Sequence, residues 1–406
     1  MLDRMSASAV YVIDAVRTPI GKYRGALSAV RTDDLACHVI ERLVARQPAL
    51  AARIDQVVFG STNQAGEDNR NVARMASLLA GLPYEVAAVT VNRLCGSGLE
   101  AVNDAARMIA LGEADVVVAG GVESMTRAPY SMPKPTEAFP RTPPVIYDTT
   151  LGWRYPNPKM KQRFELMGMG ETAENVAKKF GIGREEQDEF ALGSHKKAAA
   201  AWERGAFAKE VVPVTIPERK GDPVTVERDE SIRPDTSLEK LAKLPAAFRE
   251  GGGVTAGNSS PLNDGSAAVL LCSEAIAKEM GVTPALRVVA SATAGVDPSY
   301  MGEGPIPATK KALSRAGLRA PNLDIVELNE AFAAQSLACI RGLDLDPAKV
   351  NVNGGAIALG HPIGASGARI VATLLHAMQS DPAAKLGLAT LCIGVGQGIA
   401  TLFEKA

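Results

Sequence analysis

Short apolar runs alternate with stretches of helical periodicity along most of the sequence, and this alternation restricts the fold more than any other feature. Residues 10–15 and 57–60 are strand-like, whereas residues 32–45 and 71–80 place apolar side chains at helical spacing. Residues 116–119 are apolar throughout, which is typical of a strand in a parallel sheet that is covered on both faces. Strand and helix in turn form βαβ units, so the sequence predicts an α/β protein.

The second half of the sequence repeats the texture of the first. Residues 91–98 (VNRLCGSG) lead into an alanine-rich helix; a second Val-Asn pair at 352–353 and a Ser-Gly pair at 366–367 lead into another predicted helix at 368–378. Two similar halves packed together would place two strand-to-helix corners at one interface. A site built there could use side chains from both halves.

A proline-rich stretch interrupts the alternation between residues 127 and 165. Prolines cannot continue a helix or a sheet ladder, so we expect this stretch to leave the sheet as an inserted loop region. Its basic side chains outnumber its acidic ones. They predict either an ordinary solvated surface or a patch that attracts a phosphorylated ligand or a neighbouring subunit.

Charge and cysteine usage narrow the class of protein. The 406 residues include 44 basic and 45 acidic side chains, a balance that gives no global field to attract nucleic acid or an anionic membrane. No run of about 18 apolar residues and no export signal is visible, so we expect neither a membrane span nor secretion. Five scattered cysteines without metal-ligand spacing predict free thiols in a reducing cytoplasm and no metal site.

Cys95 lies between a predicted strand and the glycine-lined start of a helix, in the segment NRLCGSG. A thiol with the ordinary pKa of about 8.5 is mostly protonated at neutral pH, so a nucleophilic cysteine must be activated. We expect the positive end of the helix dipole and its free N–H groups to favour the thiolate. A small buried hydrophobe is the alternative for any lone cysteine, and it is our interpretation of Cys37, Cys272 and Cys339.

His361 lies in a glycine-dense loop, NGGAIALGHPIGASG, whereas His38, His195 and His376 fall in helical stretches. A histidine in such a loop is positioned by the backbone, and its imidazole can accept a thiol proton near neutral pH. For the other three histidines we expect a structural or surface role.

The segment TLCIGVGQG ends a predicted strand in Cys392 and a string of glycines. A dinucleotide-binding loop is the competing interpretation, but residues 399–403 are predicted to form a strand, so no helix follows to hold a pyrophosphate. We therefore expect the glycines to present backbone N–H groups to an oxyanion. A fourth segment, ELNEAF, places Asn329 between a strand and a helix, where it could be either an N-cap or an active-site amide.

Together these four segments resemble the thiolase family. They occur in the order of that family and at its spacing, and a fifth segment, GGVTAGNSSPLNDG, is similar to its coenzyme A loop. The resemblance implies the thiolase fold, in which two duplicated βαβαβαββ halves form a five-layer αβαβα sandwich. It implies residues 1–123 plus 256–278 as the N-terminal half, 124–255 as an inserted loop domain and 279–406 as the C-terminal half.

The resemblance also implies a role for each candidate residue. Cys95 corresponds to the nucleophile that becomes acylated, His361 to the base that deprotonates it, and Cys392 to a second acid/base at the α-carbon of acetyl-CoA. Asn329 corresponds to a residue that orders a water, which forms one oxyanion site with His361. The N–H groups of Cys95 and Gly394 correspond to the other oxyanion site.

Coenzyme A is implied as a substrate, and no permanently bound cofactor is expected. The corresponding contact residues are Arg233, Ser260, Met169, Phe248, Ala256 and Phe332. Plain core packing is the alternative for Phe248 and Phe332.

Several features resemble the branch of the family that degrades 3-oxoadipyl-CoA in aromatic catabolism. These are NQAGEDNRNVARM at 63–75, TTLGWRYPNP at 149–158, and Gly168, which replaces a histidine of the members that make acetoacetyl-CoA. The implied reaction is cleavage of 3-oxoadipyl-CoA by CoA into acetyl-CoA and succinyl-CoA, in a homotetramer built of two dimers. The alternatives are a general acetyl-CoA acetyltransferase or short-chain 3-ketoacyl-CoA thiolase, a decarboxylating ketoacyl synthase, and a non-catalytic acyl-CoA carrier.

Overall fold

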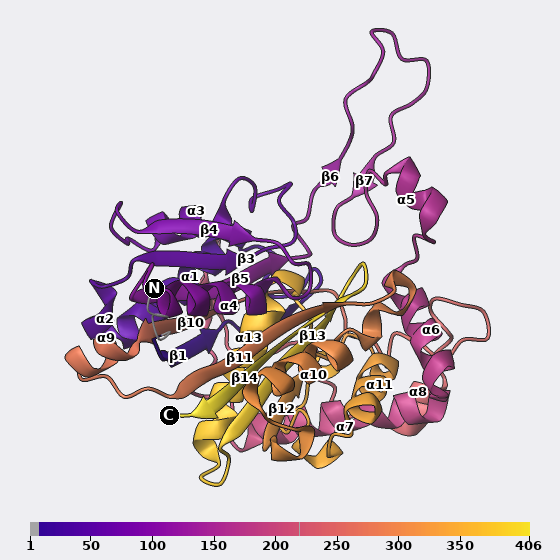
Figure 1. Ribbon diagram of the computed structural model, residues 1–406. Helices are drawn as coiled ribbons and strands as arrows, with labels where there is room; N and C mark the ends of the chain where they lie inside the picture. Colours follow the sequence, from indigo (N-terminus) through magenta and orange to yellow (C-terminus); the bar gives the residue numbers. More distant parts are fainter. Residues whose placement is uncertain (1–7, 219) are drawn as a thin grey trace, which may run out of the picture.

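Two half-sheets form the frame of the molecule in the computed structural model, which describes residues 8–218 and 220–406 (Figure 1). The first half-sheet has the order β4-β3-β5-β10-β1, in which β4, β3 and β5 are parallel and β10 is antiparallel to β5 and β1. Its strands are β1 (Val10–Arg17), β3 (Gln56–Gly60), β4 (Ala87–Val91), β5 (Val116–Ser124) and β10 (Asn263–Ser273), with the short β2 (Gly21–Lys22) beside β10.

The second half-sheet repeats this pairing pattern. Its order is β12-β13-β14-β11, in which β12 and β13 are parallel and β14 is antiparallel to β13 and β11. A single bridge from Val350 to Val326 takes the place that β4 has in the first half. The two half-sheets join where the start of β1 pairs with the start of β11. The strands are β11 (Leu286–Gly295), β12 (Ile325–Leu328), β13 (Leu386–Ile393) and β14 (Gln397–Lys405).

The middle layer consists of α4 (Ser97–Ala110) and α13 (Ile363–Ser380), which pack against each other between the two half-sheets (Figure 1). These helices touch backbone to backbone, since a Cβ atom at Gly367 would lie 2.1 Å from the backbone nitrogen of Leu99. Alanine, valine, leucine and isoleucine fill most of the surrounding core.

Helices on the outer faces complete five layers. α1 (Thr32–Arg46) and α3 (Val72–Leu79) cover the first half-sheet, and α10 (Pro305–Ala316) and α11 (Ala333–Leu343) cover the second. The predicted αβαβα sandwich is confirmed. Shorter elements are α2 (Pro48–Ala51), α9 (Glu274–Glu279), α12 (Ala356–Leu359) and the 3-10 turns η1 (Pro298–Glu303), η2 (Ala320–Asn322) and η3 (Pro347–Lys349).

Between β5 and β10 the chain leaves the sheet, as the prolines predict. An arm that carries β6 and β7 projects from the body, whereas α6 and α7 pack against α11 (Figure 1). The two longest helices of this region are α6 and α7, while the domain boundaries stay a prediction. The elements are β6 (Tyr130–Ser131), β7 (Tyr147–Asp148), α5 (Pro158–Arg163), α6 (Met169–Phe180), α7 (Arg184–Glu203), β8 (Val214–Ile216), β9 (Val224–Val226) and α8 (Leu238–Ala242). None of the helices in the described ranges is long and apolar enough to cross a membrane.

Candidate active site

The first strand-to-helix corner, between β4 and α4, holds Cys95 in a tight turn. Leu94 adopts a left-handed φ of +48°, and its N–H donates to Asn92 Oδ1 at 2.9 Å. Ser97 Oγ accepts from the Arg93 N–H at 2.9 Å and donates to the Leu94 carbonyl at 2.6 Å. The polar residues of this segment therefore fix the turn and leave Cys95 just before the helix begins at Ser97.

Cys95 is partly buried, and its sulfur lies beside Gly394 of the segment TLCIGVGQG. The backbone N–H groups of Gly394 and of Cys95 itself donate to it and favour the thiolate. Burial nevertheless has the largest effect and raises the pKa of the Cys95 thiol, and the nearby Glu123 carboxyl also raises it. The N–H groups therefore act in the expected direction, but the lost hydration outweighs them, and the pKa of the Cys95 thiol in the resting site is raised overall. Cys95 needs a base.

His361 lies in the second corner, before α13, and both of its ring nitrogens have polar neighbours. Nδ1 lies 2.6 Å from Ser366 Oγ, and Nε2 lies 3.4 Å from Asn329 Nδ2. The backbone N–H of His361 donates to Asn263 Oδ1 at 2.9 Å, which anchors the loop to β10. Burial, and then the Arg369 guanidinium, lower the pKa of His361 to about 3. The imidazole is therefore neutral at physiological pH, and one ring nitrogen is free to accept a proton.

Asn329 follows β12 and joins His361 to the strand that carries Cys392. Its N–H donates to the Thr390 carbonyl of β13 at 3.0 Å, and its amide nitrogen faces His361. Helix α11 begins at Ala333 with Phe332 at the N-cap, so the alternative that Asn329 caps this helix is wrong. Within the described residues, its buried Oδ1 has no hydrogen-bond partner, which leaves it available to a water or a substrate.

Cys392 is almost fully buried near the end of β13. Burial raises the pKa of the Cys392 thiol well above its ordinary value, and the nearby Cys95 sulfur raises it further. Two sulfur atoms from different halves of the molecule are thus close enough for charge on one to act on the other. Cys95, Cys392 and Gly394 therefore lie together, and the Asn329–His361 pair is connected to them through the hydrogen bond from Asn329 to Thr390, two residues before Cys392.

Four of the six residues predicted to contact coenzyme A adjoin this group. Met169 and Phe332 pack in one apolar cluster with Cys392. The Phe248 ring meets Phe332 edge to face, with 6.1 Å between centroids. Ser260 Oγ donates at 3.1 Å to the carbonyl that precedes Phe332. Side chains from the inserted region therefore lie against the buried thiol.

The other two predicted contacts are less closely tied to the group. Ala256 is exposed and follows Val254, a member of the same apolar cluster, by two residues. Arg233 is exposed, and its backbone N–H donates to His195 Nδ1 of α7 at 3.2 Å. The contacts of all six residues with coenzyme A stay predictions.

Glu123 is a buried carboxyl of this site that none of the sequence motifs contains. It accepts hydrogen bonds from the N–H and hydroxyl of Thr62, from the Asn63 N–H, and from the Gly364 N–H at the start of α13. Burial raises the pKa of Glu123 to about 7 despite these donors. It thereby ties the first half to the loop of His361. An acid near the end of β5, a strand whose residues are all buried, is the signal that could have revealed it.

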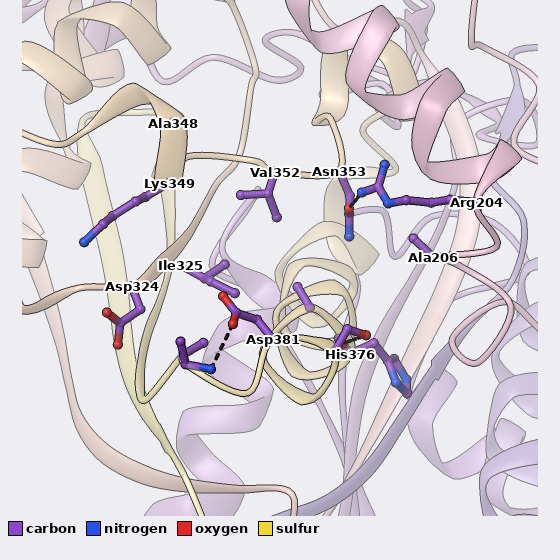
Figure 2. Close-up of a pocket in the computed structure, with 14 residues that line it drawn as sticks. Arg204, Ala206, Asp324, Ile325, Ala348, Lys349, Val352, Asn353, His376 and Asp381 are labelled. Atoms are coloured by element: carbon purple, nitrogen blue, oxygen red, sulfur yellow. Dashed lines mark hydrogen bonds between the residues drawn. The ribbon is translucent and has the colours of Figure 1, made fainter.

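A cavity of about 450 Å³ lies elsewhere, around the C-terminal end of α13 (Figure 2). Its lining includes Arg204, Lys349 and His376, and none of the predicted site residues. His376 is ten residues beyond Ser366, about 15 Å along the helix axis. The His376 ring is held by a 3.0 Å hydrogen bond from Nε2 to the Ala15 carbonyl of β1. This hollow is therefore separate from the group around Cys95.

Family comparisons divide the chain into the same two halves as the sheet. The model described as thiolase, N-terminal domain, matches residues 10–275, and that of thiolase, C-terminal domain, matches residues 282–405. The chain belongs to the thiolase family. Thiolases are acyltransferases, and coenzyme A is their substrate. Within the described residues, no group of three or more His, Cys, Asp or Glu side chains could hold a metal ion.

Relatives resemble the chain over nearly its whole length. The beta-ketoadipyl-CoA thiolase of Acinetobacter baylyi is 54% identical over 398 residues, covering 97% of this chain and 99% of the relative. The 3-oxoadipyl-CoA/3-oxo-5,6-dehydrosuberyl-CoA thiolase of Escherichia coli K12 is 53% identical with the same coverage.

Solved thiolase structures superpose on the chain equally fully. The acetyl-CoA acetyltransferase of Bacillus anthracis gives a TM-score of 0.92 at 44% identity, covering 99% of this chain and 100% of that one. Human mitochondrial 3-ketoacyl-CoA thiolase in complex with CoA gives 0.91 at 40% identity and 98% coverage of both chains. The thiolase fold inferred from the motifs is confirmed.

Proposed function

We propose that this thiolase cleaves 3-oxoadipyl-CoA with CoA into succinyl-CoA and acetyl-CoA through an acyl-enzyme on Cys95. The chemistry is supported above all by the proximity of Cys95 and Cys392, which come from different halves, and by the contact of His361 with Asn329, which bonds the strand of Cys392. The choice of substrate is supported by the relatives in Acinetobacter baylyi and Escherichia coli that are named for it.

In the first half-reaction, Cys95 adds to the C3 carbonyl while His361 takes the thiol proton. The transfer accompanies the attack, because a thiol of raised pKa and an imidazole of lowered pKa do not form a stable ion pair. The N–H groups of Cys95 and Gly394 receive the oxyanion. The C2–C3 bond then breaks, its electron pair forms the enolate of acetyl-CoA, and Cys392 donates a proton to C2.

In the second half-reaction, the thiol of free CoA attacks the succinyl thioester on Cys95. The Cys95–acyl bond breaks and succinyl-CoA leaves. The proton held by His361 and the proton of the CoA thiol then restore the thiols of Cys95 and Cys392. His361 and Asn329 stabilise the oxygen of the acetyl-CoA enolate in either direction. Two carbonyl oxygens gain negative charge in turn, so two sets of donors are required.

Space beside the thiols supports a long acyl group. A Cβ atom at Gly168 would meet one atom within 4 Å, Glu171 Oε2 at 3.3 Å. The following residue, Met169, approaches Gly394, where a Cβ atom would lie 3.4 Å from the Met169 sulfur. Loss of a side chain at residue 168 therefore leaves room near the oxyanion donors.

Arg154 is our candidate for holding the second carboxylate of the substrate. Its guanidinium donates to the Thr149 carbonyl at 3.0 Å, and Thr149 Oγ1 accepts from Asn63 Nδ2 at 3.1 Å. Asn63 in turn donates from its backbone to Glu123, whose charge reaches Cys95. This chain of contacts connects Arg154 of the inserted region to the nucleophile.

Thiolysis of 3-oxoadipyl-CoA and of 3-oxohexanoyl-CoA, which has the same carbon chain without the second carboxylate, tests the substrate. A charge-assisted hydrogen bond contributes about 1.5–3 kcal/mol, so we expect kcat/KM to favour the dicarboxylate by roughly 10–100-fold. Arg154→Gln should remove most of this preference. Arg163→Gln, an exposed arginine of α5, is the matched control and should keep it. Equal rates with both substrates would exclude the dicarboxylate.

A general acetyl-CoA acetyltransferase is the second candidate, because a relative of that name from Thiocystis violacea is 47% identical over 98% of this chain. Including acetoacetyl-CoA in the same assay separates the two. A kcat/KM for acetoacetyl-CoA that exceeds that for 3-oxoadipyl-CoA would favour the second candidate.

We also propose a homotetramer in the cytoplasm. Exposed apolar side chains on the arm between β6 and β7 support association, and five free thiols support a reducing compartment. Light scattering should give about four times the chain mass of 42.4 kDa. A monomeric mass would exclude the tetramer. The apolar arm residues are Tyr130, Met132, Phe139, Val145 and Ile146.

A further inference from the structure

Both ring nitrogens of His361 have a neighbour that restricts the position of the imidazole proton. Nδ1 lies 2.6 Å from the Ser366 hydroxyl oxygen, and Nε2 lies 3.4 Å from the Asn329 amide nitrogen. A neutral imidazole has one N–H donor and one acceptor nitrogen. The proton positions of the neighbours therefore determine which nitrogen is which.

The Ser366 hydroxyl proton is committed to the backbone. Ser366 Oγ lies 2.9 Å from the Pro362 carbonyl oxygen, which can only accept, so the hydroxyl donates to it. Serines near a helix start commonly bond the carbonyl four residues earlier in this way. The Ser366 oxygen then offers only lone pairs to His361, and Nδ1 must carry the hydrogen.

We propose that Ser366 is a positioning residue that holds His361 in its Nδ1–H tautomer, with Nε2 left unprotonated as the base for Cys95. The use of Nε2 as that base rests on the proposed function, whereas the tautomer itself does not. The Asn329 contact agrees, because an amide NH2 group donates to an unprotonated Nε2. Asn329 and Ser366 thus select the same tautomer from opposite sides of the ring.

The tautomer matters because, in the Nε2–H form, Nε2 would carry a hydrogen and would have no lone pair to accept the thiol proton. Burial and Arg369 keep the pKa of His361 at about 3, so a second proton does not bind near neutral pH. A base that must take a thiol proton needs its lone pair on the nitrogen that faces the reaction, and a third group commonly fixes this orientation.

Nitrogen-15 NMR of the imidazole tests the tautomer without any turnover. In protein labelled with 15N-histidine, the His361 signals can be identified by their loss in His361→Asn. We expect a protonated Nδ1 and an unprotonated Nε2 in the wild type, an Nε2–H form in Ser366→Ala, and a return of the Nδ1–H form in Ser366→Thr. A wild-type ring protonated at Nε2, or a Ser366→Ala ring with an unchanged tautomer, overturns the proposal.

Acylation kinetics give the second readout. We expect Ser366→Ala to slow acylation of Cys95 by about 10²-fold with little change in KM, and Ser366→Thr to recover most of the rate. Ser380→Ala is the matched control, because Ser380 makes the same kind of bond, to the His376 carbonyl at 2.8 Å on the same helix.

The two readouts separate the possible failures. A wild type with the expected Nδ1–H ring but no thiolysis would sink the proposed function and support the tautomer assignment. Equal acylation rates for the wild type and Ser366→Ala would overturn the positioning role of the serine.

Discussion

The two strand-to-helix corners occupy matching places in their half-sheets but differ in length. Residues 92–96 connect β4 to α4, whereas residues 351–362 connect the Val350 bridge to α13 and fold the short helix α12 on the way. The short corner presents a sulfur and backbone N–H groups. The long corner carries an imidazole into the same site. Duplication thus gives two matched helices, and unequal connections give the unlike groups that a nucleophile and its base require.

The strands beside the corners differ in a similar way. Glu123 is the penultimate residue of β5, which lies between β3 and β10. Cys392 is the penultimate residue of β13, which has the equivalent place between β12 and β14 in the second half-sheet. The carboxyl accepts four hydrogen bonds and holds the start of α13. The thiol packs among apolar side chains near Cys95. One position therefore supports the structure in one half and lies at the reacting groups in the other.

Removal of the short-corner sulfur should have the largest effect. We expect Cys95→Ala to lower thiolysis by at least about 10⁴-fold, because no other group can hold the acyl chain between the two half-reactions. Thiolysis assays and the intact protein mass after incubation with acyl-CoA measure this. Cys37→Ala, which removes another partly buried thiol, should leave both unchanged. An acyl adduct on Cys95→Ala would assign the nucleophile to another residue.

Replacing the thiol of β13 should separate the two half-reactions. We expect Cys392→Ser to keep acetylation of Cys95 and to lower condensation by at least about 10²-fold, because a serine hydroxyl does not exchange protons with carbon as readily. Mass spectrometry follows the first step, and an assay of acetoacetyl-CoA formation follows the second. Cys339→Ser is the control, since its buried sulfur donates to the Gly302 carbonyl, as a hydroxyl can. Condensation at the wild-type rate would show that Cys392 moves no proton.

The matched helices can be tested by pushing them apart. Gly367→Ala should lower the free energy of unfolding by about 1–3 kcal/mol, because the new methyl group overlaps the backbone of α4. Gly193→Ala in α7, where no atom lies within 4 Å of the new carbon, should instead add about 0.5–1 kcal/mol. Urea denaturation measures both. If Gly367→Ala gains stability as Gly193→Ala does, the helices are not in backbone contact.

His361, in the long corner, should also make the free energy of unfolding depend on pH. His361 has a pKa of about 3 in the folded chain, and an unfolded histidine has its ordinary pKa of about 6.5, so between these values the unfolded chain binds the additional proton. Stability therefore falls as pH decreases through 6.5. From pH 7.5 to 5.5 the loss from His361 is about 1.4 kcal/mol. Urea denaturation of the wild type and His361→Asn at both pH values isolates it, and identical losses in the two proteins would contradict the assignment.

Local patterns in the sequence predict an α/β protein and both corners, whereas the five layers are implied by the family resemblance alone. Apolar runs mark β1, β3 and β5 because each is buried, and the segments around Cys95 and His361 are recognisable because glycine and serine are needed for their turns. The raised pKa of Cys95 could not be read from the sequence, since burial comes from packing against the other half. Glu123 was missed for the same reason, because its donors come from segments far apart in the chain.

The residue at which α11 begins distinguishes the two interpretations of Asn329, an N-cap and an active-site amide. The ELNEAF segment permits a helix from either Ala331 or Ala333, and the later start leaves the amide free for His361. Val350 shows a similar limit, because it forms a single bridge followed by a turn where the first half has a strand. Differences of one or two residues in an element depend on tertiary contacts that periodicity does not encode.

The close backbone packing around the two central helices leaves little room for new side chains near the site. A Cβ atom at Gly121 would lie 2.1 Å from the Gly364 carbonyl oxygen, and one at Gly60 would lie 2.4 Å from the carbonyl carbon of Ser97. A side chain at either glycine would therefore overlap the backbone of a central helix. Met169 and Phe248 reach the site from the inserted region, where Met169 packs with Cys392 and the Phe248 ring meets Phe332. A change in acyl preference is therefore to be sought at side chains of the inserted region, such as Met169 and Phe248, and not at Gly60 or Gly121.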